Sequence, residues 1–336
     1  MPRRTPGQHF LLSAAARSLS LRDVMGLTEQ EAAAAFRAIR WAASGGEPTC
    51  PECGCLGCYE YASRPIFKCK GCGRQFSLTS GTIFAGRKLS VRDHLLAIVL
   101  FVNAAKGISS LQLARDLGVQ YKTAFVLTHK LREAMAAELK GLVLDGTVEV
   151  DGCHVGGHVR PENEKADRKD RRLAENTSGK RRCVVVLRQR GAPEGAAGSQ
   201  GRTLPFALAG EAEGVALVRS RVAAGSVIHA DEAASWDALH AHYEMKRINH
   251  QQAYSLDGAC TNLAESFFSR LRRAEWGQHH RISALYLGRY AAEMAWREDH
   301  RRQSNGGQAK RLVGLALSQP MSVDWSGYWQ RRRAAA

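Results

Sequence analysis

The chain has 336 residues, of which 44% are hydrophobic, and this composition excludes a disordered protein and supports one or two domains with a sizeable core. Its 48 lysines and arginines outnumber the 32 acidic residues and give a formal net charge of +16. Such an excess favours polyanionic partners such as nucleic acid, although ribosomal and membrane-surface proteins share it. Because no apolar run approaches the roughly 18 residues of a spanning helix, we expect a cytoplasmic protein without a membrane partner.

Helical and β-type patterns follow one another along the chain. Residues 27–43 predict a helix, because small and apolar side chains recur along one face before "SGGEP". Residues 90–140 are again helical in pattern, with breaks at Gly107 and Gly118. Five β-type runs follow: "TVEVD", "RCVVVLRQR", "TLPFALAG", "SVIHAD" and "KRINH". Helical patterns separate the last three runs and follow the final one, which predicts a mixed sheet with helices on both faces.

Clustered cysteines precede the long helical region. Two C-x2-C pairs, fifteen residues apart, consist of Cys50, Cys53, Cys69 and Cys72. This spacing is typical of a tetrahedral Zn²⁺ site with four thiolate ligands. A segment this short buries little surface by itself, so we expect one structural Zn²⁺ that supports folding. Cys55 and Cys58 form a further pair, and the spacing assigns them no role.

The segment "SSLQLARDLGVQYKTAFVLTHKLREAM" predicts a helix-turn-helix, with a serine cap and a turn at Gly118. The first residues of its second helix lie where a recognition helix reaches bases and phosphates; they are Gln120, Tyr121, Lys122 and Thr123. An ordinary helical hairpin is the alternative. The cysteine pairs upstream and the positive charge favour DNA contact.

Two of the β-type runs end in an aspartate, Asp151 and Asp231. Neighbouring strands of one sheet that end in this way would place both carboxylates in one pocket. Glu265 lies on the amphipathic helix "CTNLAESFFSRLRR", and Asn262 lies three residues earlier on the same face. Three acids of this kind can hold two Mg²⁺ ions, one activating the nucleophile and the other stabilising the leaving oxygen. Each acid alone is more often a loop, cap or solvated residue, so the prediction depends on the three together.

Four stretches carry a resemblance to a known family: "CPECG…FKCKGCGRQFSLTSGTIFAGRKLS", "LARDLGVQYKTAFVLTHKLREAM", "VEVDGCHVGG" and "TNLAESFFSRLRRAEWGQHHRIS". Together they resemble bacterial insertion-sequence transposases of the group numbered fifteen ninety-five, which combine a zinc ribbon with an RNase H-like DDE domain. The likeness covers about residues 45–305. It implies an α/β fold class: an RNase H-like mixed five-stranded sheet with flanking helices, preceded by a zinc ribbon and a helix-turn-helix.

The resemblance also implies a division of the chain and of its site. The domains would be an N-terminal helical segment (1–46), a zinc ribbon (47–88), a helix-turn-helix (89–141), a DDE catalytic domain (142–305) and a C-terminal tail (306–336). Asp151 and Asp231 would be the catalytic aspartates, with two Mg²⁺ or Mn²⁺ ions. The third member in the family is Asn or Glu, and this chain has both. We prefer Glu265, because a carboxylate binds Mg²⁺ better than an amide, and keep Asn262 as its neighbour. Arg272 would contact a DNA phosphate.

Two further groups have open interpretations. Glu293, Arg297 and His300 share one helix face, and they either support the site or a DNA end, or form an ordinary ion pair beside an exposed histidine. The basic loop 160–182, which ends in Arg181 and Arg182, either follows a DNA strand or is a solvated loop.

The function expected from these features is DNA transposition. The protein would bind the terminal inverted repeats of its element, cut the DNA, and join the ends to double-stranded target DNA as a nucleoid-associated homo-oligomer. One alternative is a DNA-binding regulator without enzymatic activity. Another is an RNase H-like nuclease that does not transfer strands.

Overall fold

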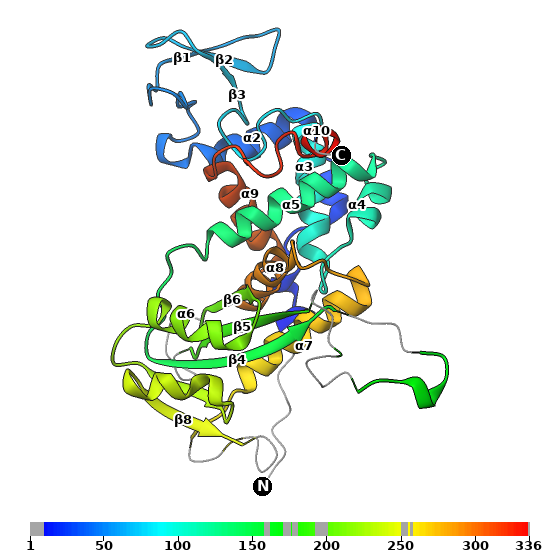
Figure 1. The fold of residues 1–336 in the computed structure, drawn as a ribbon. Coiled ribbons are helices and arrows are strands. Elements are labelled where there is room, and N and C mark those ends of the chain that lie inside the picture. Colours follow the sequence, from blue (N-terminus) through cyan, green and yellow to red (C-terminus); the bar gives the residue numbers. More distant parts are fainter. Residues whose placement is uncertain are drawn as a thin grey trace, which may run out of the picture. The chain divides into compact units, whose positions relative to one another are not determined.

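The computed structural model describes residues 10–157, 162–170, 176, 181–191, 201–249, 255 and 258–334 (Figure 1). The chain divides into two compact units. One unit combines Met1–Glu138 with His300–Ala336, and the other is Leu139–Asp299. Within the described residues, none of the helices combines the length and hydropathy needed to cross a bilayer.

The first unit is mainly helical. Its described helices are α1 (Leu21–Met25), α2 (Glu29–Arg40), α3 (Val91–Asn103), α4 (Ser110–Asp116), α5 (Tyr121–Ala137), α9 (Asn305–Ser318) and α10 (Tyr328–Ala334), with short 3-10 turns at Phe10–Leu12, Ala14–Ala16 and Ala42–Ser44. A capping box starts α2, because Thr28 and Glu31 each accept a hydrogen bond from the other's backbone N–H. Although α9 comes from the far end of the sequence, it packs against α2, α3 and α5.

A small antiparallel sheet in this unit consists of β1 (Cys58–Glu60), β2 (Ile66–Cys69) and β3 (Gln75–Ser77), in that order. The Trp41 ring, just after α2, packs edge-on against Phe67 and Phe76, with ring centroids 5.4 Å and 6.4 Å away. These three aromatic side chains are buried. They join the ribbon to the helices.

The helices α4 and α5, which lie in the segment predicted to form a helix-turn-helix, pack against each other. The Ser109 hydroxyl caps α4 by accepting from the backbone N–H of Gln112 at 3.1 Å. Gly118 ends α4 with φ 64°, a left-handed conformation that glycine adopts without strain. The predicted break at this glycine is confirmed.

The second unit contains a five-stranded sheet in the order β6-β5-β4-β7-β8. Its strands are β4 (Thr147–Val155), β5 (Arg182–Gln189), β6 (Thr203–Leu208), β7 (Val227–Asp231) and β8 (Glu244–Ile248). The pairs β4–β5 and β5–β6 are antiparallel, whereas β4–β7 and β7–β8 are parallel. The mixed sheet expected from the sequence is therefore confirmed.

Both faces of this sheet are covered (Figure 1). One face packs against α7 (Asn262–Ala274) and α8 (Leu287–Asp299), and the other against α6 (Gly214–Arg221) and the 3-10 helix η7 (Ala234–Ala241). Two shorter segments, η6 (Glu211–Glu213) and the π-helical η8 (Glu275–His279), follow β6 and α7. Because helices cover both faces, the interior strand β5 is almost continuously apolar and buried rather than alternating.

The predicted RNase H-like α/β class is confirmed, with the strands and helices in the expected order. The segment "SWDALHAHY" forms a 3-10 helix rather than the expected α-helix. Of the basic loop 160–182, residues 160–161, 171–175 and 177–180 lie outside the described residues. Its described part includes a 3-10 turn at Lys165–Asp167.

Candidate active site and zinc cluster

The two strand-end aspartates occupy equivalent positions of neighbouring strands. In the parallel pair β4–β7, Val150 lies opposite Ala230, so the next residues, Asp151 and Asp231, are also matched. Side chains at matched positions of adjacent parallel strands point to the same face, about 4.8 Å apart. The structure thus brings together two acids that are far apart in sequence.

A buried glutamate ties this edge of the sheet to helix α7. Glu149, two residues before Asp151, has no exposed surface, and its Oε2 accepts from the backbone N–H groups of Leu263 at 2.8 Å and Ala264 at 3.0 Å. The Arg190 guanidinium lies 3.0 Å from its other oxygen. No side chain of α7 itself caps the helix, so the Glu149 carboxylate satisfies N–H groups that would otherwise lack partners. The anchor holds the first turn of α7 beside Asp151.

The environment of Asp151 opposes ionisation. Burial raises the pKa of its carboxyl to about 7, and the negative charge of Asp231 contributes to the rise. The Gly152 backbone N–H, which donates to Asp151 Oδ1 at 2.7 Å, acts in the opposite direction, while the charges of Glu211 and Glu265 raise the pKa further. A bound divalent cation would neutralise the negative charge of crowded, half-buried carboxylates of this kind, and carboxylate oxygens are the ligands that Mg²⁺ prefers.

Glu211 is a fourth acid at this edge, and the sequence analysis missed it. It follows β6, its Oε2 accepts from the Ser235 hydroxyl at 2.9 Å, and its carboxylate lies against Gly152. A side chain at position 152 would overlap this carboxylate, because an added Cβ would lie 2.9 Å from Glu211 Cδ. The glycine after Asp151 was visible in the sequence, but it did not reveal which residue occupies the space that the glycine leaves.

The carboxylates are spread more widely than the ligands of a single ion. Within the described part of the chain, only the four ribbon cysteines bring three or more ligand atoms within 4.8 Å of one another. A two-ion centre is wider: ions about 3.5–4 Å apart, each about 2.1 Å from its ligands, place the outer ligands up to roughly 8 Å apart. The described acids therefore do not form a compact cluster of the kind that holds a single ion.

The other residues expected near the site lie on α7. Asn262, the first residue of the helix, and Glu265 are both exposed, and the charge of Glu265 acts on Asp151. Arg272 lies farther along, where its Nη2 donates to the Cys153 sulfur at 2.9 Å. Cys153 is two residues beyond Asp151 on β4, so Arg272 is held close to the same strand.

The acid–arginine pair on α8 has a structural explanation. Arg297 Nε donates to Glu293 Oε1 at 2.9 Å, and both side chains are buried. His300, in the other unit, is also buried, and its Nε2 lies 3.3 Å from Glu138. The ordinary ion pair is thus observed for Glu293 and Arg297, whereas the histidine is buried rather than exposed.

The ribbon cysteines form a four-sulfur cluster. The Sγ atoms of Cys50 and Cys72 are 3.6 Å apart, and those of Cys53 and Cys69 are 3.5 Å apart. Sulfurs at the corners of a Zn²⁺ tetrahedron with bonds of about 2.3 Å are separated by about 3.8 Å, so the spacing fits zinc.

The backbone helps to prepare this cluster for a metal. The N–H groups of Cys72 and Gly71 donate to Cys69 Sγ and help to hold the pKa of that thiol at about 6, which favours the thiolate that binds metal. Cys55 and Cys58 are not members of the cluster.

The predicted DNA-contact residues begin α5 and β5. Gln120, Tyr121 and Lys122 are exposed, and Thr123 is half-buried. The indole of Trp329 on α10 donates to the Lys122 carbonyl at 3.3 Å, and the Lys122 ammonium lies 5.4 Å from its ring centroid. The C-terminal helix therefore packs beside the start of α5, a contact that nothing in the sequence pattern predicted.

The two arginines at the end of the basic loop border the end of β4. Arg182 begins β5 opposite Val155, and Arg181 packs against Gly157. Both side chains are half-buried. Their positive charge lies at the same sheet edge as the residues that follow Asp151.

Comparison with known families identifies the class of protein. Residues 143–299 match the ISXO2-like transposase domain, and residues 27–75 match the transposase zinc-ribbon domain. The chain therefore carries both of these transposase domains, as its sequence motifs indicated.

One similar protein comes from a mobile element. The chain is 25% identical over 302 residues to an uncharacterized protein in transposable element ISH50 of Halobacterium salinarum, and the match covers 87% of this chain and 98% of that protein. No solved structure matches.

Proposed function

We propose that the protein is the DNA transposase of an insertion sequence, which cuts the ends of its element and joins them to target DNA. The observation that carries this proposal is the matched placement of Asp151 and Asp231 on neighbouring parallel strands, beside a helix that Glu149 anchors. The two transposase domains found in the chain support it.

Asp151, Asp231 and Glu265 would hold two Mg²⁺ or Mn²⁺ ions. Such ions activate an attacking oxygen and stabilise the departing one in phosphodiester chemistry. Anchoring of α7 by Glu149 keeps the third carboxylate in a fixed place, and the exposed Arg272 guanidinium is available to a DNA phosphate. Asn262 would contact the substrate beside Glu265.

The reaction would have two chemically related steps. Water attacks a phosphorus atom at the element end, the bond from that phosphorus to the 3′ oxygen breaks, and a 3′-hydroxyl is released. That hydroxyl attacks a target phosphodiester, so one phosphorus–oxygen bond forms as another breaks. The exchange needs no external energy source, and the fixed carboxylates contribute by positioning the reacting groups.

The first unit would bind the element ends. Its zinc ribbon and the exposed start of α5, with Gln120, Tyr121 and Lys122, offer polar and basic groups to DNA, and the net charge of +16 favours a polyanion. Arg181 and Arg182 would add phosphate contacts at the end of β4. Joining two ends in one event requires an oligomer on DNA.

The test uses the full chain, a DNA fragment with both flanks of its coding region, a supercoiled target plasmid and Mg²⁺. Covalent joint molecules, detected by sequencing across the junctions, are expected. The Asp151→Asn and Asp231→Asn variants should bind the end DNA normally and form no products, whereas Glu244→Gln, an exposed acid of the same sheet, should remain active.

The same assay separates the alternatives. Cleavage without joint molecules would indicate a nuclease, and DNA binding without cleavage by any variant would indicate a regulator. If Glu265 is the third ligand, Glu265→Gln should abolish cleavage, while Asn262→Ala should mainly weaken substrate binding. The reverse pattern would assign the metal to Asn262.

A further inference from the structure

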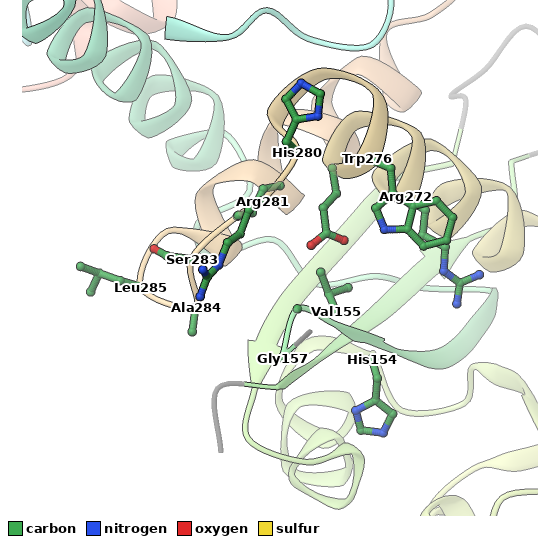
Figure 2. Close-up of a pocket in the computed structure, with 13 residues that line it drawn as sticks. His154, Val155, Gly157, Arg272, Trp276, His280, Arg281, Ser283, Ala284 and Leu285 are labelled. Atoms are coloured by element: carbon green, nitrogen blue, oxygen red, sulfur yellow. The ribbon is translucent and has the colours of Figure 1, made fainter. Parts of the chain in front are cut away.

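A cavity of about 670 Å³ lies beside the carboxylate site in the second unit. It is lined by the end of β4, the end of α7, η8 and the loop after η8. Figure 2 shows Trp276 and Arg272 on one side, Arg281 on the other, and Val155 and Gly157 between them. The volume is within the usual range for small-molecule sites, about 300–1,000 Å³.

The cavity presents an unusually exposed aromatic ring. Trp276 is 70% exposed, whereas Trp41, Trp236, Trp296 and Trp325 are all buried. Tryptophan buries a large apolar surface when it can, and it is enriched at binding interfaces, where one side of the ring is apolar and the N–H is in contact with water. Its flat face suits a planar ring.

The charge around this ring is positive. Arg272 and Arg281 both line the cavity and are exposed, as are the imidazoles of His154 and His280. Burial, together with the charge of Arg181, lowers the pKa of His154 and so favours its neutral imidazole, and the positive charge of the cavity therefore comes from Arg272 and Arg281. Glu275 also lines the cavity; burial raises the pKa of its carboxyl, whereas the nearby charge of Arg272 acts in the opposite direction. An aromatic face among cations fits a nucleotide, whose base stacks while its phosphates pair.

The backbone that carries Trp276 departs from regular helix. Residues 275–279 are π-helical, and His280, directly after them, has φ 56°, a positive value that a non-glycine residue rarely adopts. Local strain of this kind is retained when the surrounding structure requires it, frequently at functional sites. Here the wide turn ends α7 with the indole facing solvent.

The distance from the cavity to Asp151 corresponds to the length of a few nucleotides of a DNA strand. His154 and Val155 are three and four residues beyond Asp151 on β4, which is roughly 10–13 Å along an extended strand. This span equals about three to four nucleotides at the 3.4 Å spacing of a stacked strand. The bond from Arg272 to Cys153 holds the cavity wall to the same strand.

We propose that this cavity receives an unpaired nucleobase of the DNA strand held at the carboxylate site, stacked on Trp276, with Arg272 and Arg281 at the flanking phosphates. The inference rests on the proposed function and adds a feature of its substrate: the strand has at least one base out of the duplex near the cleaved bond. Extracting a base costs a few kcal/mol, which stacking on an aromatic side chain offsets.

The test measures binding of the full chain to a duplex with a four-nucleotide overhang, with Ca²⁺ in place of Mg²⁺ so that cleavage does not interfere. One overhang carries 2-aminopurine, whose fluorescence falls when it stacks, and a matched overhang is abasic. The wild-type protein should quench the 2-aminopurine and bind the abasic overhang roughly 5- to 150-fold more weakly.

Trp276→Ala should lose the quenching and bind both overhangs equally, while Trp276→Phe should recover part of the difference. Val143→Ala, which removes an exposed apolar side chain of the same unit that does not line the cavity, is the control and should behave as wild type. Equal affinity of wild type for both overhangs, or unchanged quenching in Trp276→Ala, would overturn the proposal.

Cleavage with Mg²⁺ is measured on the same DNA. Cleavage without any dependence on the unpaired base overturns the cavity proposal and leaves the proposed function intact. Base-dependent binding without cleavage supports the cavity and counts against the proposed reaction.

Discussion

Replacement of the buried Glu149 is expected to destabilise the first turn of α7, which lies beside the candidate active site. Glu149→Ala removes the acceptor of the Leu263 and Ala264 N–H groups, and each bond to a charged acceptor contributes about 1.5–3 kcal/mol. The ion pair with Arg190 adds little, because the Arg190 side chain is 37% exposed and is screened by solvent. The expected loss of unfolding free energy is about 3–5 kcal/mol, in line with breaking other buried pairs.

Glu149→Gln separates the loss of charge from the loss of the acceptor. The amide oxygen still accepts from the start of α7, but without a negative charge, so the expected loss is about 1–2 kcal/mol. Urea unfolding of the full-length variants measures both values. Glu244→Ala, which removes an exposed glutamate of the same sheet, is the matched control and should change stability by less than about 0.5 kcal/mol.

The activity of Glu149→Ala should fall more than its stability explains. At a temperature where the variant remains folded, displacement of the first turn of α7 by about 1 Å would reduce DNA cleavage roughly 100-fold. A Glu149→Ala protein that unfolds within 1 kcal/mol of wild type and cleaves normally would refute the anchoring role.

Three further predictions concern the acids and the ribbon. Because the folded-state pKa of Asp151 is raised to about 7, the protein without added Mg²⁺ or Mn²⁺ should lose stability as pH rises from about 4 to 7. Asp151→Asn should remove this slope and stabilise the protein by about 2 kcal/mol at pH 8, measured by urea unfolding without a chelator so that the ribbon keeps its zinc. An unchanged slope would contradict the crowding of the acids. Glu211→Gln should weaken Mn²⁺ binding about tenfold, because the carboxylate beside Gly152 loses its charge. Calorimetry measures the affinity, and Glu244→Gln is the control that should leave it unchanged. Equal affinities of wild type and Glu211→Gln would show that Glu211 does not contribute to the metal site. Cys69→Ser, or removal of zinc by a chelator, should unfold the ribbon and abolish binding to the element ends in gel-shift assays. Cys55→Ser, which changes a cysteine outside the cluster, should not. A fully active Cys69→Ser protein would exclude a structural zinc.

The parts of the fold that follow from local spacing could be predicted from the sequence. The two C-x2-C pairs identified the four sulfurs that the structure brings together, because ligands on tight turns are set by near neighbours in the chain. The helices α4 and α5, the break at Gly118 and the order of strands and helices along the second unit followed from periodicity and glycine positions, whereas the order of the strands within the sheet did not.

The long-range contacts could not be predicted in this way. Glu149 lies within the β-type run "TVEVD" with no sign of its role, yet its carboxylate accepts from the backbone at the start of α7, 114 residues later. The indole at position 276 lies just beyond an amphipathic helix, where a helical pattern gives no sign of a π-turn that leaves it in solvent. Both depend on which segments meet after the sheet has formed.

The amino-acid sequence by itself therefore indicated the two transposase domains, and it singled out the four clustered cysteines and the two strand-end aspartates, since each depends on residue type and short spacing. Only the tertiary structure decided that Asp151 and Asp231 lie in register, that Glu149 and Glu211 join them, and that Glu293 and Arg297 are buried as a pair. The reason is physical: charges separated by many residues interact only when strand pairing and helix packing bring them together and remove the water between them.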